Sequence, residues 1–208
     1  RVPVYVSEED RYFTDESQYM PKDGFTSLVK NILAHPHIKL KLGKDAIQNI
    51  TFKDGQIYYK NKLFEGTVIY TGCVDELFSY KYGSLPYRSL TFVFKTKRRS
   101  SYQDAAVVNY TTNKRYTRIS EFSKFTCNPQ KNTVIVKEYP KPYYGGEAIP
   151  YYPIPLAKNY ELYAKYEAEA KKYKNLYLLG RLANYKYVNM DIAVKNAIDL
   201  YEKILEED

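Results

Sequence analysis

Two arginines lie inside segments whose composition favours β-strands, Arg88 in PYRSLTF and Arg118 in YTRISEF. A charged side chain within a strand has to meet water, a carboxylate or a ligand, because burying it unpaired is costly. For Arg118, an ion pair with Glu121 or Glu138 and a contact with a ligand remain equal alternatives. A planar guanidinium binds phosphate oxygens through two parallel hydrogen bonds, so the chemistry indicated is recognition of an anion.

Tyrosine is the second unusual feature, with 25 tyrosines and no tryptophan in 208 residues. Tyr151 and Tyr152, and later Tyr185 and Tyr187, lie in loop-like sequence after predicted strands. Their hydroxyl groups could add hydrogen bonds to a phosphate. Interleaved tyrosine and arginine could also stack the bases of a single-stranded nucleic acid. That use requires the rings along one strand face, and their clustering in loops favours phosphate instead.

The segment LYLLGRLANYKYVNMD combines both residue types at the start of a helix. An apolar strand is predicted over 176–179, followed by Gly180, Arg181 and a loop. A helix N-terminus carries unpaired amides and partial positive charge that attract an anion, and a glycine lets the backbone approach a ligand closely. An ordinary strand–loop–helix turn, with Asn189 or Asp191 as N-cap, explains the pattern equally well.

Composition narrows the class of protein. The formal net charge of +8 fits an anionic ligand, either a nucleic acid or a phosphorylated small molecule, or simply solvated lysines. The densest basic cluster, at 95–99, is predicted to be a solvated hairpin loop. No apolar run approaches the roughly 20 residues of a membrane-spanning helix, and the mean hydropathy is −0.57.

Other sequence signals are absent. No signal peptide is visible, and Cys73 and Cys127 show neither metal-like nor disulfide-like spacing, so a cytoplasmic protein without a metal is expected. No Ser/His/Asp arrangement, dinucleotide-binding GxGxxG or Walker loop occurs in the sequence.

The elements that must position these residues follow from periodicity. Apolar spacing predicts helices at four places, 24–34, 74–80, 156–173 and 191–206. The last helix has an apolar face formed by Val194, Ile198, Tyr201 and Leu205. Besides 176–179, strands are predicted over 38–42 and 67–71, with a hairpin over 50–59 turning at Asp54-Gly55. Four β-rich segments between 87 and 139 predict an antiparallel meander, and the proline-rich connector 140–155 predicts no regular structure.

The predicted fold class is α+β or mixed, with an antiparallel sheet flanked by α/β segments. Three parts are predicted: 1–72, 73–155 and 156–208. The strands in the flanking parts lack partners, and the chain begins at Arg1 in strand-like sequence. A fragment whose first strands lie upstream of Arg1 is therefore expected.

Collinear motifs extend along nearly the whole chain. They are R-x-P-V at 1–4, YF-x-D at 12–15, Q-x-x-P-x-x-G-[FY]-T at 18–26, Y-x-G-x-x-D-x-x-F at 70–78, G-x-L-x-YRSL at 83–90, NY at 109–110, YTRI-x-E at 116–121, KEYP at 137–140, PYYP at 150–153 and GRL-x-x-Y-K-Y-x-x-M at 180–190. With these motifs the chain resembles the UDP-galactopyranose mutase family, over about the C-terminal half of such an enzyme.

The resemblance implies an isomerase of galactofuranose and cell-wall polysaccharide biosynthesis that interconverts UDP-galactopyranose and UDP-galactofuranose. In that family's mechanism, N5 of reduced FAD attacks the anomeric carbon and expels UDP, and the resulting adduct lets the sugar ring open and reclose. The resemblance implies a substrate-binding domain at 73–155. It also implies a Rossmann-like flavin domain, to which 1–72, with the end of a helical-domain loop, and 156–208 contribute. Because the flavin-binding glycine motif is missing, the chain alone is expected to be inactive and not to bind FAD.

The family's functional residues transfer onto matching positions of this sequence. The implied catalytic residues are Arg118, Arg88 and Glu138. The implied substrate-binding residues are Arg1, Tyr12, Asn109, Tyr152 and Tyr187. The implied cofactor-binding residues are Gly180, Arg181, Asn189 and Met190. The dipole of the final helix would favour the anionic reduced flavin.

One position departs from the family pattern, because many members carry Asp where this chain has Asn189. Asparagine forms hydrogen bonds but carries no charge, which leaves open any role that needs a carboxylate there. The implied partners are UDP-galactose and UDP-galactofuranose, without membrane or nucleic acid, and a homodimer or association through strand edges. The alternative function is a non-catalytic module that binds a phosphorylated ligand or a nucleic acid.

Overall fold

The computed structural model of the chain describes residue 8 and residues 15–111, 114–126, 130–146 and 148–207. The chain divides into two compact units. Unit 1 comprises Arg1–Gly43 and Thr91–Pro140, and unit 2 comprises Lys44–Leu90 and Lys141–Asp208. The fold is mixed α and β with antiparallel sheets, as predicted. No described helix is long and apolar enough to cross a membrane.

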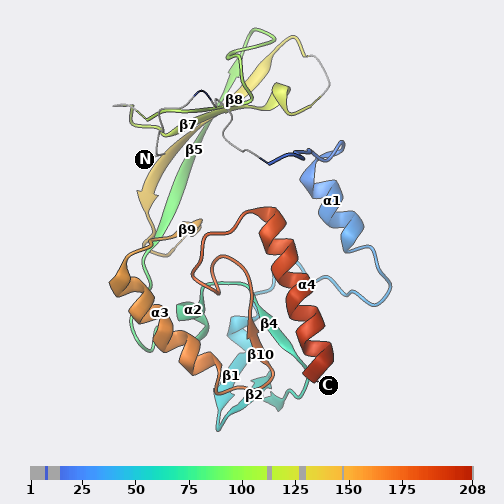
Figure 1. The fold of residues 1–208 in the computed structure, drawn as a ribbon, viewed down its shortest axis with the longest axis vertical. Coiled ribbons are helices and arrows are strands. Elements are labelled where there is room, and N and C mark those ends of the chain that lie inside the picture. The colour runs from blue at the N-terminus through green and yellow to red at the C-terminus, as the bar shows by residue number, and fades with distance from the viewer. Residues whose placement is uncertain (1–7, 9–14, 112–113, 127–129, 147, 208) are drawn as a thin grey trace. The chain divides into compact units, whose positions relative to one another are not determined.

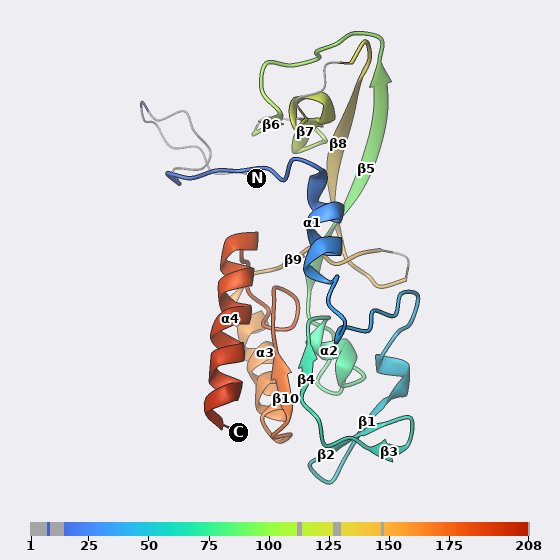
Figure 2. The same ribbon diagram turned by 90° about the vertical axis from the view of Figure 1, so that its right-hand side faces the viewer.

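Unit 1 contains most of a five-stranded antiparallel sheet. Strand β7 (Arg118–Glu121) pairs with β6 (Val107–Asn109) on one side and with β8 (Thr133–Pro142) on the other. The strand order is β6-β7-β8-β5-β9, and the long strands β5 (Tyr87–Lys97) and β8 run side by side in Figures 1 and 2. The predicted meander is therefore correct for β6, β7 and β8 and wrong for β5, which lies next to β8.

The connection between β5 and β6 explains this order. The buried Glu121 at the end of β7 accepts hydrogen bonds from the backbone amides of Tyr102 at 2.8 Å and Gln103 at 3.0 Å. These bonds hold the connection across the end of β7, so β6 is laid down on the far side of β7 from β8. The 3₁₀ turn η2 (Phe122–Lys124) follows β7 directly.

Two other predictions in unit 1 require correction. Residues 38–42 form no strand, and their side chains are all exposed, Leu42 by 80%. Alternating sequence forms a strand only where a second strand pairs with it and covers one face. The basic cluster at 95–99 is also not wholly a loop, because β5 continues to Lys97 beside β8.

Helix α1 (Gly24–Ile32) begins where predicted and ends two residues earlier. Its apolar side chains are 40–65% exposed, and they are Phe25, Leu28, Val29 and Ile32. Periodicity thus predicts the helix correctly, and its apolar stripe remains largely exposed.

Unit 2 contains the main hydrophobic core. Its largest fully buried side chains are Tyr87, Tyr166, Tyr185 and Ile57. Strands β4 (Val68–Tyr70) and β10 (Leu176–Leu178) form a parallel pair, and α3 (Ala157–Ala170) contributes buried side chains to the core. In the described residues this pair is the whole parallel sheet, so a Rossmann-like flavin domain stays a prediction.

A small antiparallel sheet follows the 3₁₀ turn η1 (Ile47–Asn49). It consists of β1 (Ile50–Lys53), β2 (Gln56–Tyr59) and β3 (Lys62–Leu63). The predicted hairpin is confirmed, because Asp54 and Gly55 join β1 and β2 with φ of 49° and 74°. Two successive positive φ angles are what a two-residue type I′ turn requires.

The short helix α2 (Val74–Leu77) ends three residues before its predicted end. Ser79 and Tyr80 have φ of 50° and 57°, and such left-handed backbone ends a helix. Asp75 is 2% exposed, and its Oδ2 accepts the amide of Leu85 at 2.8 Å.

The connector 140–155 contains more regular structure than predicted. Strand β8 continues to Pro142, and β9 (Tyr152–Pro153) pairs antiparallel with the start of β5. Proline is tolerated in a strand at the edge of a sheet, where its missing N–H is not needed. Strand β9 is the last strand in its sheet, so Pro153 does not prevent it from pairing with β5.

Helix α4 (Met190–Glu207) begins one residue before its predicted start. None of its described side chains is buried, and its apolar face is 52–62% exposed, at Val194, Ile198, Tyr201 and Leu205. The helix is coloured red in Figure 1. As in α1, the sequence pattern predicts the apolar stripe correctly.

Candidate active site

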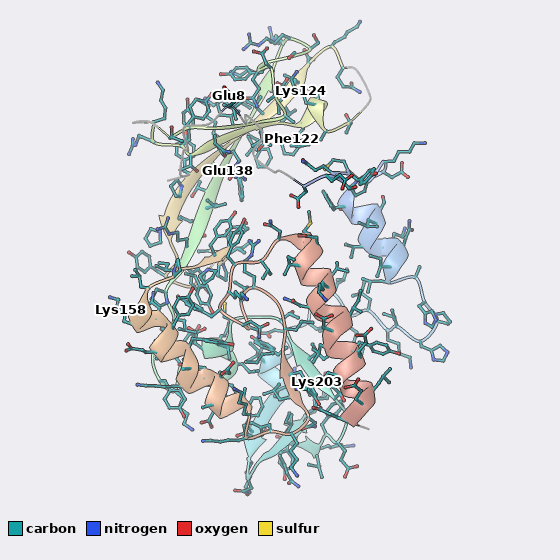
Figure 3. The ribbon with its side chains drawn as sticks, viewed as in Figure 1. Glu8, Phe122, Lys124, Glu138, Lys158 and Lys203 are labelled. Atoms are coloured by element: carbon teal, nitrogen blue, oxygen red, sulfur yellow. The ribbon has the colours of Figure 1, made fainter. Side chains whose placement is uncertain are left out.

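A row of three polar residues crosses the sheet of unit 1. Arg118 on β7 pairs directly with Asn109 on β6 and with Glu138 on β8. Residues directly opposite each other in antiparallel strands project to the same face of the sheet. The Arg118 Nε donates to Asn109 Oδ1 at 3.0 Å, and its Nη1 lies 4.0 Å from Glu138 Oε2. Figure 3 labels Glu138 on β8.

The structure decides which carboxylate Arg118 faces. Glu121, one of the two candidates, points to the other face of β7 and is occupied by the loop amides described above. Burial pushes the pKa of Glu121 up, but the hydrogen bonds from Gln103 and Tyr102 outweigh it and lower that pKa. Glu138 is therefore the partner, and the separation of 4.0 Å leaves Arg118 with donors for a ligand.

Glu138 is more buried than Arg118, the charged residue beside it. Its side chain is 14% exposed, against 31% for Arg118. Burial raises the pKa of Glu138, and the positive charge of Arg118 offsets part of that rise. A carboxyl group with a raised pKa is better suited to exchange protons near neutral pH than an ordinary one.

A second cluster lies in unit 2 and combines an arginine with stacked tyrosines. The rings of Tyr152 and Tyr187 stack with centroids 5.7 Å apart and planes 20° apart. The Arg181 guanidinium lies 5.1 Å from the Tyr152 centroid and 4.5 Å from the Tyr187 centroid. Arg88 on β5 pairs directly with Tyr152 on β9, so its exposed side chain projects to the same face as that ring.

Tyr185 positions the loop that carries this cluster. The sequence placed it with Tyr187 in one loop, but the two have different roles. Tyr187 is 58% exposed, whereas Tyr185 is fully buried. The Tyr185 hydroxyl donates to the carbonyl of Pro86 and accepts the amide of Ile154 at 3.2 Å. These bonds connect the loop to the residue before β5 and to the residue after β9.

Gly180 borders an open space. Gly180 has φ of 93°, which favours glycine, and a methyl group there would meet nothing within 4 Å. A cavity of about 430 Å³ is lined by Gly180, Val188 and side chains from α3 and α4. Asn189 occupies the N-cap position, with its carbonyl accepting the amide of Ala193 at 2.9 Å, and both Asn189 and Met190 are exposed.

Sequence reasoning missed a buried ion cluster on α3. Glu169 is 5% exposed and accepts hydrogen bonds from Tyr82 Oη at 2.6 Å, Lys172 Nζ at 2.8 Å and Lys81 Nζ at 2.9 Å. These donors lower the pKa of Glu169 to about 2. Glu169 lies 87 residues from Tyr82, so only its i, i+3 spacing from Lys172 was visible in the sequence.

The predicted site residues thus fall into two described groups. Unit 1 brings together Asn109, Arg118 and Glu138. Unit 2 brings together Arg88, Tyr152, Arg181 and Tyr187, with Gly180, Asn189 and Met190 on the same loop and helix start. Arg1 and Tyr12 lie outside the described residues. Chemically, both groups offer guanidinium and neutral hydrogen-bonding donors, the combination suited to a phosphorylated ligand.

The fold and these side chains therefore define a mixed α/β protein suited to binding an anion, and comparison with known proteins gives the class. Residues 1–187 match the family model GLF, UDP-galactopyranose mutase. A UDP-galactopyranose mutase of Mycoplasma genitalium is 37% identical over 99% of this chain and 52% of its own length. A dTDP-fucopyranose mutase of Escherichia coli is 35% identical over 96% of this chain and 52% of its own length. A UDP-galactopyranose mutase of Mycoplasma pneumoniae is 33% identical over 99% of this chain and 53% of its own length.

These relatives are mutases, which are isomerases, and the chain spans about half the length of the curated relatives it matches. The chain belongs to the UDP-galactopyranose mutase family, as its motifs predicted. Enzymes of this family are flavoproteins that act on UDP-sugars.

Proposed function

We propose that the whole protein carrying this chain interconverts UDP-galactopyranose and UDP-galactofuranose. The family match over residues 1–187 carries this proposal. The ordered environments of Arg118 and Arg181 support it, because the leaving group in such an exchange is a nucleoside diphosphate and needs cationic and phenolic donors.

The residues of unit 1 take the following roles in this proposal. Arg118 binds the diphosphate with the guanidinium donors that Asn109 and Glu138 leave available. Asn109 orients Arg118 through the bond to Nε. Glu138, with its raised pKa, holds or accepts a proton at the sugar as the ring opens and closes. Taken by itself, unit 2 offers the hydroxyl groups of Tyr152 and Tyr187 as donors for a phosphate, and Arg88, which projects to the same face as Tyr152, is assigned to the sugar.

The family's FAD fits part of the described surface. The open space at Gly180 and the exposed N-terminus of α4 suit the edge of a flavin ring, which Gly180, Asn189 and Met190 would hold. When bound, reduced flavin supplies covalent catalysis at the anomeric carbon. The 208 residues contain no GxGxxG for the cofactor's diphosphate. We therefore propose that 1–72 and 156–208 contribute to a flavin domain but do not bind FAD alone.

One relative suggests a second substrate. The Escherichia coli protein is named a dTDP-fucopyranose mutase and is nearly as similar to this chain as the first relative, at 35% against 37% identity. Both substrates present a nucleoside diphosphate on a hexose, so a phosphate-binding arginine or tyrosine would serve either. The assay must therefore include both.

The test is an isomerisation assay on the whole protein. With dithionite present, we expect conversion of UDP-galactofuranose to UDP-galactopyranose, and no conversion when the flavin is oxidised. A kcat/KM at least tenfold higher for dTDP-fucofuranose would transfer the assignment to the second substrate. A colourless protein that isomerises neither sugar nucleotide would contradict the proposal.

A further inference from the structure

In the described residues, the side chain of Arg181 has four recorded contacts, each with one of the two stacked tyrosines or with its neighbour in the chain. Its Nη1 donates to the carbonyl of Tyr151 at 3.2 Å, and its Nη2 donates to the carbonyl of Val188 at 2.6 Å. Its guanidinium also lies against the rings of Tyr152 and Tyr187, at 5.1 and 4.5 Å from their centroids.

These contacts fix each tyrosine twice. Tyr151 precedes Tyr152, and Val188 follows Tyr187, so each hydrogen bond holds the backbone next to one ring while the guanidinium attracts the ring itself. The two tyrosines come from separate segments, β9 and the loop before α4. Arg181 is therefore a bridge between those segments.

A ring as exposed as Tyr187, at 58%, would otherwise sample several rotamers. If the ring is already held in place, its side chain loses less conformational entropy when a ligand binds. Binding is then stronger without any new contact. Arginine suits this task, because its planar fork can donate to two carbonyls and stack on two rings at once. Lysine has a single charged nitrogen and cannot do both.

We infer that Arg181 is a positioning residue that holds the hydroxyl groups of Tyr152 and Tyr187 as a preorganised pair for a nucleoside diphosphate. The identity of that ligand rests on the proposed function. The resemblance assigned Arg181 to cofactor binding, whereas its hydrogen bonds and ring contacts direct it to the tyrosines. Its effect on the ligand is exerted through them.

The first test needs no ligand and uses the chain as it is. Aromatic NMR signals of Tyr152 and Tyr187, assigned with the Tyr152→Phe and Tyr187→Phe variants, report the stacked geometry through ring-current shifts. Both Arg181→Met and Arg181→Lys should move both signals toward random-coil positions. Arg99→Met is the matched control, because Arg99 lies 4.5 Å from the Tyr102 centroid in unit 1 and should leave both signals unchanged. Unchanged signals in both Arg181 variants would overturn the inference.

The second test asks whether Arg181 acts through the tyrosines. UDP affinity is measured by NMR titration for the wild type, Arg181→Met, the double variant Tyr152→Phe/Tyr187→Phe, and the triple variant. We expect Arg181→Met to weaken UDP binding about tenfold in the wild type and less than twofold once both hydroxyl groups are gone. An equal loss in both backgrounds would mean that Arg181 contacts UDP itself, which would overturn the inference. If the wild type does not bind UDP, the proposed ligand fails at this cluster, and the ring-current result alone decides the positioning role.

Discussion

Arg118 keeps hydrogen-bonding capacity for a ligand although it has two partners in the sheet. A guanidinium has five N–H donors. In the described contacts, one donates to Asn109 and another lies 4.0 Å from Glu138, beyond hydrogen-bonding distance. The side chain is 31% exposed, so an anion can reach it.

Replacement of Arg118 by alanine should therefore impair catalysis strongly in the whole protein. We expect a loss of roughly 3 kcal/mol of transition-state stabilisation, because the substitution removes a guanidinium and leaves the carboxylate of Glu138 without its partner. The measurement is kcat/KM for UDP-galactofuranose under reducing conditions. Arg115→Ala, an exposed arginine three residues away, is the control and should change kcat/KM less than twofold. Wild-type turnover in a folded Arg118→Ala protein would make Arg118 a structural residue.

Glu138 gives a prediction that depends on pH. Its pKa is raised in the folded protein above the ordinary value of 4.5, so the folded state binds the proton more tightly than the unfolded state. Stability linked to Glu138 is consequently present below pH 4.5 and is lost as the pH rises through the folded pKa. Glu138→Gln should thus gain stability relative to wild type as the pH rises from 4 to 8. Urea unfolding of both proteins at these two pH values measures the difference.

The same geometry predicts the effect of Arg118 on that titration. Since the charge of Arg118 lowers the pKa of Glu138, Arg118→Met should raise this pKa further. Carbon-detected NMR of the Glu138 carboxyl during a pH titration reports it directly. An unchanged pKa in the variant would show that the two groups do not interact.

At the scale of elements, Glu169 attaches α3 to the segment after α2. Its buried carboxylate accepts hydrogen bonds from Lys81 and Tyr82, which follow α2, and from Lys172, which follows α3. Its recorded hydrogen bonds reach none of the candidate-site residues, so its role is to hold α3 against the core.

Glu169→Gln should destabilise the chain by about 2 kcal/mol at pH 7. This is less than the full shift of its pKa would give, because Lys81 and Lys172 are more than half exposed and water screens their charges. The pKa of Glu169 is lowered from 4.5 to about 2, so its contribution is present above pH 4.5 and is lost as the pH falls toward 2.

Chemical denaturation at pH 7 and pH 3 measures this effect. Glu167→Gln is the matched control on the same helix, because Glu167 forms an exposed i, i+4 pair with Lys171 at 2.8 Å. Such pairs contribute about 0.3–0.5 kcal/mol. Equal losses of unfolding free energy in the two variants would show that the buried Glu169 cluster stabilises the chain no more than an exposed ion pair.

At the scale of the whole molecule, both α1 and α4 expose their apolar stripes. Exposed apolar faces and strand edges favour association with another chain. We therefore expect the chain to self-associate as its concentration rises, measured by sedimentation velocity. Ile198→Lys, on the exposed face of α4, should reduce association. Lys195→Ala on the polar side of the same helix should not. A monomer at all concentrations would contradict this prediction.

The ligand-binding behaviour of the whole chain is also predictable. FAD should not bind measurably in calorimetry, because the sequence supplies no glycine-rich loop for the FAD diphosphate. UDP should bind weakly through arginine and tyrosine donors. Micromolar binding of FAD would show that the described residues hold the complete flavin site.

The sequence by itself determined the family, most of the helices and strands, and the types of residue at the candidate site. Motif spacing identifies the family because binding and catalysis require particular residue types at particular positions in the chain. The turn at Asp54-Gly55 was predictable because two positive φ angles leave few alternatives. Local patterns of this kind depend on interactions between residues close in the chain.

Only the tertiary structure decided which of these residues meet. The choice of Glu138 over Glu121 for Arg118, the place of β5 beside β8 and the different roles of Tyr185 and Tyr187 all depend on pairings between distant segments. The failed strand at 38–42 has the same cause, because alternation shows that a strand could form but not whether a partner lies beside it. Likewise, no sequence pattern shows that Arg181 bridges Tyr152 and Tyr187, since its hydrogen bonds connect carbonyl groups that only folding brings together.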